Sequence, residues 1–231
     1  PAFPAGFLLV LNALGLFLIF WLGKTLFNRE VGTLAALLFA LSFEQTQYAM
    51  YFGNPGPAVL TTLLFWVGLA LLIFKKNWRG LPISLFGLGL SVQFEFFLFY
   101  LTAILVLLLL VFRKRIWQLL NFESLAVAAA AFIVPVSTFI LADLKFGART
   151  AKTLLGVLGG LGRGGGDFTF AANLYIRRLV LLVHDNLMGL ANIDRLALLL
   201  LLVVVVFWIA RKRPGFDRVF FLLIWVFSSS V

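Results

Sequence analysis

Cysteine is absent from this chain of 231 residues, and histidine occurs only once. Without cysteine there can be no disulfide and no thiolate nucleophile, and a single histidine excludes a histidine-rich metal site. Charged residues are also scarce, at 12% of the sequence. The few carboxylates leave one metal chemistry open, because their oxygens can hold a hard divalent cation. No other cofactor is indicated.

Long apolar runs dominate the rest of the chain. Hydrophobic residues make up 63% of it, and the mean hydropathy is +1.09. The runs are about 15 to 20 residues long, close to the length at which a helix crosses a bilayer. A soluble domain of this size could not bury so much apolar surface. The sequence therefore predicts an all-α integral membrane protein, a polytopic transmembrane helical bundle.

The apolar runs predict about eight spanning segments. Their expected bounds are 5–22, 31–49, 58–74, 81–93, 96–112, 124–142, 194–210 and 218–231. We group them into the first part of a transmembrane domain at 1–142, a non-cytoplasmic segment at 143–193, and further helices of the same domain at 194–231. The middle segment combines a glycine-rich tether at 156–166 with an amphipathic stretch at 168–193. That stretch is expected to form an interfacial helix along the membrane surface.

Basic residues fall in alternate loops between the expected spans. Four groups hold 12 of the 19 lysines and arginines: Lys24 and Arg29; Lys75, Lys76 and Arg79; Arg113, Lys114 and Arg115; Arg211, Lys212, Arg213 and Arg218. Loops rich in lysine and arginine stay in the cytoplasm, so these loops are expected to be cytoplasmic. The net charge of +10 then reflects topology and contact with membrane lipids, and it indicates no nucleic-acid partner.

An amide and a carboxylate, Gln93 and Glu95, interrupt the apolar run Leu81–Phe112 near its middle. As one helix these 32 residues would be about 48 Å long, against a hydrocarbon core of about 30 Å. A single crossing would also put the next basic loop on the wrong side. We therefore expect a helical hairpin at 81–112 that turns at Gln93 to Glu95. Gly87 and Gly89 permit the close backbone approach that a hairpin needs, and the short first arm is expected to lie inside protein or to end in a recess.

In this topology three pieces share the non-cytoplasmic side: the loop 44–57, the hairpin tip and the segment from Asp143 onward. Acidic and basic residues are mixed there, which suits a charged headgroup or a phosphate. Ordinary solvated loop charges fit the same pattern, so both interpretations stay open. The single histidine, His184, stands beside Asp185, but neighbouring side chains point about 100° apart on a helix, which argues against a catalytic dyad.

Four short motifs follow one another between residues 5 and 155. The first, 23-GKTLFNREVG-32, links a pair of spans, and the second, 47-QYAMYFGNPGPAVLTTLLFWVGL-69, sets a polar residue before a proline. The third is the glycine-containing 80-GLPISLFGLGLSVQFEF-96, and the fourth, 135-PVSTFILADLKFGARTAKTLL-155, ends a helix with an acidic and a basic residue. Together they resemble the GT-C membrane glycosyltransferases, in particular glycosyltransferase family 39, the protein O-mannosyltransferases and the aminoarabinose transferases of lipid A.

The resemblance implies transfer of one sugar from a polyprenyl-phosphate carrier to a glycan, lipid or protein acceptor at the non-cytoplasmic face, usually with inversion. A carboxylate would deprotonate the acceptor hydroxyl, and basic groups would hold the leaving phosphate. Lys145 and Arg149 are then the expected phosphate partners. The candidates to orient the sugar, the acceptor or a divalent cation are Glu44, Asn54, Gln93, Glu95 and Asp143.

The chain departs from the family pattern at several of these positions. Glu95 stands where histidine or lysine is frequent, Phe146 stands where histidine is common, and Asn54 replaces an acidic residue. Structural roles also stay open, since Glu95 can pair with a neighbouring helix and Asp143 with Lys145.

The chain begins at Pro1 and stops at Val231 directly after an apolar run. We expect a fragment of a longer protein. The family's catalytic carboxylate lies in the first outer loop, which this fragment is expected to lack, so the catalytic residue is not identified and the fragment should be inactive alone. A bacterial plasma membrane suits the resemblance. Two other classes stay open: a transporter or flippase of lipid-linked sugars, and a non-catalytic membrane scaffold subunit.

Overall fold

The computed structural model describes residues 2–42, 55–148 and 215–228, and the single positions 45, 53, 152, 155, 156, 173, 176 and 177. Helices account for the regular structure of these residues, and no strand occurs among them. The elements are α1 (Ala2–Leu26), α2 (Arg29–Leu41), α4 (Pro55–Phe74), α5 (Gly80–Phe94), η1 (Phe96–Tyr100), α6 (Leu101–Val111), α7 (Arg113–Ile116), η2 (Trp117–Leu119), α8 (Phe122–Phe146) and α12 (Phe216–Ser228). The predicted all-α class is confirmed for this part of the chain.

Three of the described helices are long and apolar enough to cross a membrane: Gly6–Leu26, Gly56–Phe74 and Phe122–Phe146. A fourth candidate is the bent pair Phe96–Val111 and Arg113–Leu119, whose two parts meet at 76°. These helices agree with an integral membrane protein, whereas the count of eight crossings stays a prediction. The predicted span at 194–210 and most of the tether and of the interfacial helix lie outside the described residues.

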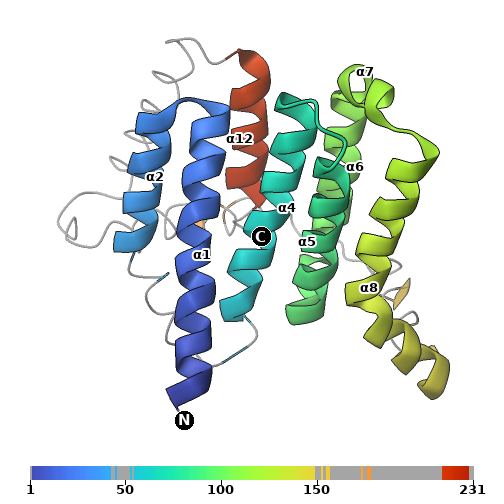
Figure 1. The fold of residues 1–231 in the computed structure, drawn as a ribbon. Helices are drawn as coiled ribbons and strands as arrows, with labels where there is room; N and C mark the ends of the chain where they lie inside the picture. The colour runs from blue at the N-terminus through green and yellow to red at the C-terminus, as the bar shows by residue number, and fades with distance from the viewer. Residues whose placement is uncertain are drawn as a thin grey trace.

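The helices stand side by side and alternate in direction (Figure 1). α2 packs on α1, α1 on α4, α4 on α5 and α5 on α8. α5 thus lies between two other helices, and eight of its residues are buried. A helix of 15 residues is only about 22 Å long, too short for the hydrocarbon core. Burial between α4 and α8 confirms that this first arm of the hairpin lies inside protein.

One end of the bundle, the upper end in Figure 1, carries the α1–α2 turn, the α4–α5 loop, α7 and the start of α12. Arg115 and Asp217 form an ion pair there that joins α7 to α12. We name it the basic end after its residues Lys24, Arg29, Lys75, Lys76, Arg79, Arg113, Lys114, Arg115 and Arg218. The predicted gathering of these basic loops on one side is confirmed. Arg211–Arg213 lie outside the described residues, and the cytoplasmic location of this end stays a prediction.

Glycines let α5 lie close to both neighbours. A Cβ added to Gly87 would lie 2.5 Å from the backbone nitrogen of Phe65 in α4, too close for a carbon atom. One added to Gly89 would lie 3.1 Å from the carbonyl oxygen of Phe132 in α8. The predicted close approach is confirmed, but it joins α5 to α4 and α8. The two arms of the hairpin are not the elements that these glycines bring together.

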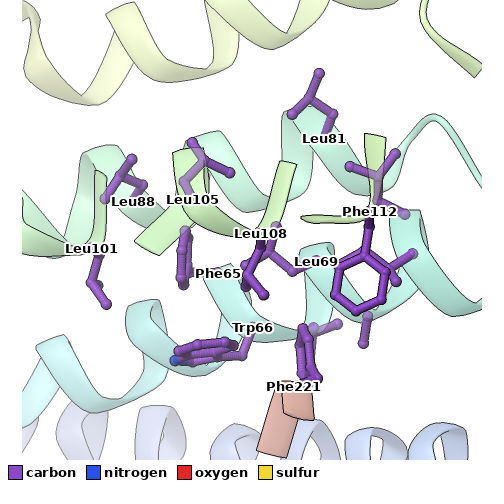
Figure 2. Close-up of a cluster of buried hydrophobic side chains, with 14 of the residues drawn as sticks. Phe65, Trp66, Leu69, Leu81, Leu88, Leu101, Leu105, Leu108, Phe112 and Phe221 are labelled. Atoms are coloured by element: carbon purple, nitrogen blue, oxygen red, sulfur yellow. The ribbon is translucent and has the colours of Figure 1, made fainter. Parts of the chain in front are cut away.

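The apolar core gathers around Phe65 and Trp66 of α4 (Figure 2). Trp66 contacts two residues of α12, with ring centroids 5.2 Å from Phe221 and 6.0 Å from Trp225. The labelled side chains around them come from α4, α5, α6 and α12 and from the junction of α6 and α7: Leu69, Leu81, Leu88, Leu101, Leu105, Leu108, Phe112 and Phe221. This core holds α12 against the middle of the bundle, far along the chain from α4.

Candidate functional site

The hairpin turns at Glu95. α5 ends at Phe94, and the backbone of Glu95 is extended, with φ −140° and ψ 103°. Its N–H still donates to the Ser91 carbonyl at 2.8 Å, while its own carbonyl accepts from the Leu98 N–H at 3.0 Å and starts η1. The predicted break between Gln93 and Glu95 is therefore confirmed. The half-buried Glu95 side chain lies at the turn itself.

Gln93, on the last turn of α5, is held by a residue of α8. Its Oε1 accepts a hydrogen bond of 2.9 Å from the hydroxyl of Thr138. Next to this contact, the ring of Phe96 in η1 packs edge to face on that of Phe139 in α8, with centroids 6.2 Å apart. One polar and one aromatic contact thus dock the tip on α8 and orient an exposed amide.

Asp143 and Lys145 lie on the last turn of α8. Gly147 ends the helix in the left-handed conformation, with φ 74°, and its N–H donates to the Asp143 carbonyl. Lys145 is exposed, and its Nζ lies 5.4 Å from the centre of the Phe146 ring. Asp143 follows Thr138 by five residues, or about 7.5 Å along the helix axis. The carboxylate and the ammonium therefore lie just beyond the point where the hairpin docks.

The structure brings four of the seven predicted site residues to one end of the bundle, opposite the basic end: Gln93, Glu95, Asp143 and Lys145. We name it the tip end. Glu95 forms no ion pair with any residue that the structure describes, so the alternative of a salt bridge to a described helix finds no support. Glu44, Asn54 and Arg149 lie outside the described residues, and their roles stay predictions.

Two polar residues were missed by sequence reasoning. Thr138 is the partner of Gln93, and the side-chain amide of Asn12 in α1 donates to the Gln45 carbonyl at 3.1 Å, at the start of the loop 44–57. Each is a hydrogen-bonding residue within a largely apolar run, and that was the signal available. A hydroxyl or amide in such a run needs a partner, because an unpaired polar group in a bilayer is costly.

The tip end carries an amide, a hydroxyl, two carboxylates and an ammonium group. Amides, hydroxyls and carboxylates can hydrogen-bond the hydroxyls of a sugar, and an ammonium group can pair with a phosphate. No group of three metal-ligating side chains occurs in the part of the chain that the structure describes. The divalent cation therefore stays a prediction, and we derive no step from it.

Replacing Thr138 with valine removes the partner of Gln93 with little change of shape. Because the pair is exposed, we expect a coupling energy of only about 1 kcal/mol between the two residues. A double-mutant cycle of Thr138→Val and Gln93→Leu, followed by unfolding in detergent, measures it. Ser137→Ala is the control, since the Ser137 hydroxyl bonds the Val134 carbonyl of its own helix at 2.8 Å. A coupling energy of zero would show that the contact does not hold the tip.

Comparison with protein families gives a match over more than half of the chain. Residues 6–141 match the family described as dolichyl-phosphate-mannose-protein mannosyltransferase. No curated protein and no solved structure matches the chain. The family match covers more than half of the sequence, includes Gln93, Glu95 and Thr138, and ends just before Asp143. With its apolar helical bundle, the chain therefore belongs to this GT-C family of integral membrane glycosyltransferases.

Proposed function

We propose that the protein transfers a sugar from a polyprenyl-phosphate carrier to an acceptor at the tip end, outside the cytoplasm. The observation that supports this most is the family match over 6–141, which contains the whole hairpin and its docking partner Thr138. A donor with a lipid tail stays in the bilayer, so its phosphate and sugar lie at the membrane surface, where a bundle end can reach them. The tip end offers polar groups at that depth.

In the proposed reaction the oxygen of the acceptor hydroxyl attacks the anomeric carbon. The bond between that carbon and the phosphate oxygen breaks, the configuration inverts, and the hydroxyl proton passes to a carboxylate that acts as general base. The polyprenyl phosphate leaves with the negative charge, which Lys145 and Arg149 stabilise. None of the residues described at the tip end is proposed as the base.

Gln93, Glu95 and Asp143 are proposed to orient the sugar and the acceptor, together with Glu44 and Asn54. The hydrogen bond to Thr138 favours this role for Gln93, because it leaves the amide nitrogen to donate to a ligand while Oε1 is engaged. Positioning groups of this kind raise the rate by holding the reacting atoms in line.

The membrane is proposed to be a bacterial plasma membrane, with the protein crossing it several times. The basic end then faces the cytoplasm, in agreement with the bias of lysine and arginine, and the tip end faces outward. The acceptor is a glycan, a lipid or a protein that is present on that side.

The test is a transfer assay with the full-length protein in proteoliposomes. Polyprenyl-phosphate mannose with a radiolabelled sugar is the first donor, since mannose stands in the family's description. We expect label on the acceptor and release of polyprenyl phosphate. Label that crosses the bilayer on an intact carrier would instead indicate a flippase.

Replacing Lys145 with alanine is expected to lower kcat/KM about tenfold, the loss of one charge-assisted contact to the leaving phosphate in a solvent-exposed position. Lys145→Arg should keep most of the activity because it keeps the charge. Lys24→Ala at the basic end is the control, with an unchanged rate expected. Equal rates for Lys145→Ala and Lys24→Ala would contradict the role of Lys145.

A further inference from the structure

A hollow of about 310 Å³ opens at the basic end, between the end of α4 and the start of α12. Ile73 and Phe74 form its apolar wall, and Lys76, Arg115 and Arg218 bring cations to it from three separate elements. A second hollow of about 390 Å³ adjoins it across the pair formed by Arg115 and Asp217. Volumes of this size are typical of small-ligand sites, which begin at about 300 Å³.

The charges around the first hollow are unbalanced. Asp217 supplies a single carboxylate, and its ion pair with Arg115 uses it. Lys76 and Arg218 have no carboxylate partner among the residues that the structure describes. The N-terminus of α12 also opens here at Gly215 and adds a partial positive charge. The hollow is therefore suited to an anion.

Lys76 itself occupies a position where glycine is usual. Its φ is 51°, in the left-handed region. The N–H of Asn77 donates to the Leu71 carbonyl at 3.2 Å, so the chain folds back on the last turn of α4 at this point. Glycine adopts this conformation without strain, whereas lysine does not. A lysine in a strained position beside an anion-suited hollow favours a role for its side chain there.

The position of the hollow relative to the membrane follows from α7, which lies beside it. The segment Arg113–Leu119 turns 76° away from Phe96–Val111, so it lies across the end of the bundle. It carries three consecutive basic residues, and the side chain of Trp117 is 78% exposed. Basic helices with an exposed tryptophan lie at the headgroup level of a membrane. An anion bound at this depth is most simply part of a lipid.

We propose that this hollow binds the headgroup of an anionic phospholipid. Its phosphate lies between Lys76 and Arg218, and the first carbons of its glycerol and acyl chains lie against Ile73 and Phe74. The Arg115–Asp217 pair separates this site from the adjoining hollow. The site is at the opposite end of the bundle from the proposed sugar transfer and does not depend on it.

The experiment uses the full-length protein in detergent micelles that contain phosphatidylglycerol or phosphatidylcholine, with retained lipid counted by native mass spectrometry. The double variant Lys76→Gly/Arg218→Gln is expected to bind phosphatidylglycerol about tenfold more weakly, because each residue donates a charge-assisted hydrogen bond to the phosphate. Retention of phosphatidylcholine should not change. Glycine relieves the strain at position 76, so the thermal midpoint should be equal or higher.

The control variant Lys24→Gln/Arg29→Gln removes the same charge from the same end, but neither residue lines the hollow. It is expected to change affinity by less than about twofold, as for general surface charge. An equal loss in both variants would overturn the site in favour of non-specific attraction. Competition by water-soluble glycerol phosphate at the same concentration would overturn the lipid as its occupant. If the double variant is unstable, Arg218→Gln alone should weaken binding about threefold, the square root of the tenfold effect.

Discussion

Replacing Gly68 with alanine is expected to lower the free energy of unfolding by about 3 kcal/mol and the thermal midpoint by about 6 to 12 °C. The added Cβ would lie 2.4 Å from the backbone nitrogen of Ser84 and 2.7 Å from the carbonyl oxygen of Gly80, both in α5. These are backbone atoms of a buried helix, so only a shift of α4 against α5 can relieve the clash. Thermal unfolding of the full-length protein in detergent measures the effect.

Gly6→Ala is the matched control for this substitution. Gly6 also lies within a helix, and a Cβ added to it would meet nothing within 4 Å. Alanine favours the helix over glycine by up to about 1 kcal/mol, so the control should be neutral or stabilising. The same outcome for Gly68→Ala would show that α4 and α5 do not touch there. Because α5 carries Gln93 and leads directly into Glu95, we expect Gly68→Ala to lower transfer activity as well.

Replacing Trp66 with alanine is expected to cost about 3 to 5 kcal/mol. The indole is 1% exposed, and it contacts Phe65 at 5.3 Å and Phe221 at 5.2 Å between ring centroids. Moving the indole from lipid into the protein contributes little free energy, because both surroundings are apolar. The loss of stability comes mainly from the dispersion contacts that the cavity removes. α12 loses its main aromatic anchor, so amide hydrogen exchange in Phe216–Ser228 should become faster.

Trp117→Ala is the control for the tryptophan substitution. Trp117 is 78% exposed, and its removal leaves no cavity in the core. We expect its thermal midpoint to change by less than about 2 °C, the usual range for surface positions. Trp66→Phe should recover part of the stability because the aromatic stacking is partly kept. If Trp66→Ala and Trp117→Ala have the same thermal midpoint, the packing of α12 does not depend on Trp66.

The hairpin shows which features of the fold could be predicted from the sequence and which could not. Its turn was predictable because Gln93 and Glu95 cannot lie unpaired in the middle of a lipid-exposed span, and because the basic loops require an even number of crossings between them. The neighbours of α5 were not predictable. α5 carries small and polar residues on more than one face, so its pattern marks close contacts but does not say which helix makes each of them.

The candidate site was predicted in the same uneven way. Gln93, Glu95, Asp143 and Lys145 could be assigned to one end from topology, and the structure places all four there. Thr138 could not be identified as a partner. It lies 45 residues from Gln93 in the sequence, and only the rotation of α8 against α5 brings its hydroxyl to the amide.

By itself, the sequence determined the membrane class, the basic end, the turn of the hairpin and the family. Composition and charge decide the first three, since the transfer of each segment into lipid depends on its own residues. The family rests instead on the motifs and on the match over residues 6–141. The tertiary structure alone decided that α5 lies between α4 and α8, that Thr138 holds Gln93, and that Lys76 and Arg218 meet at one hollow. These contacts depend on the distance and rotation between helices, which packing of side chains from distant segments sets.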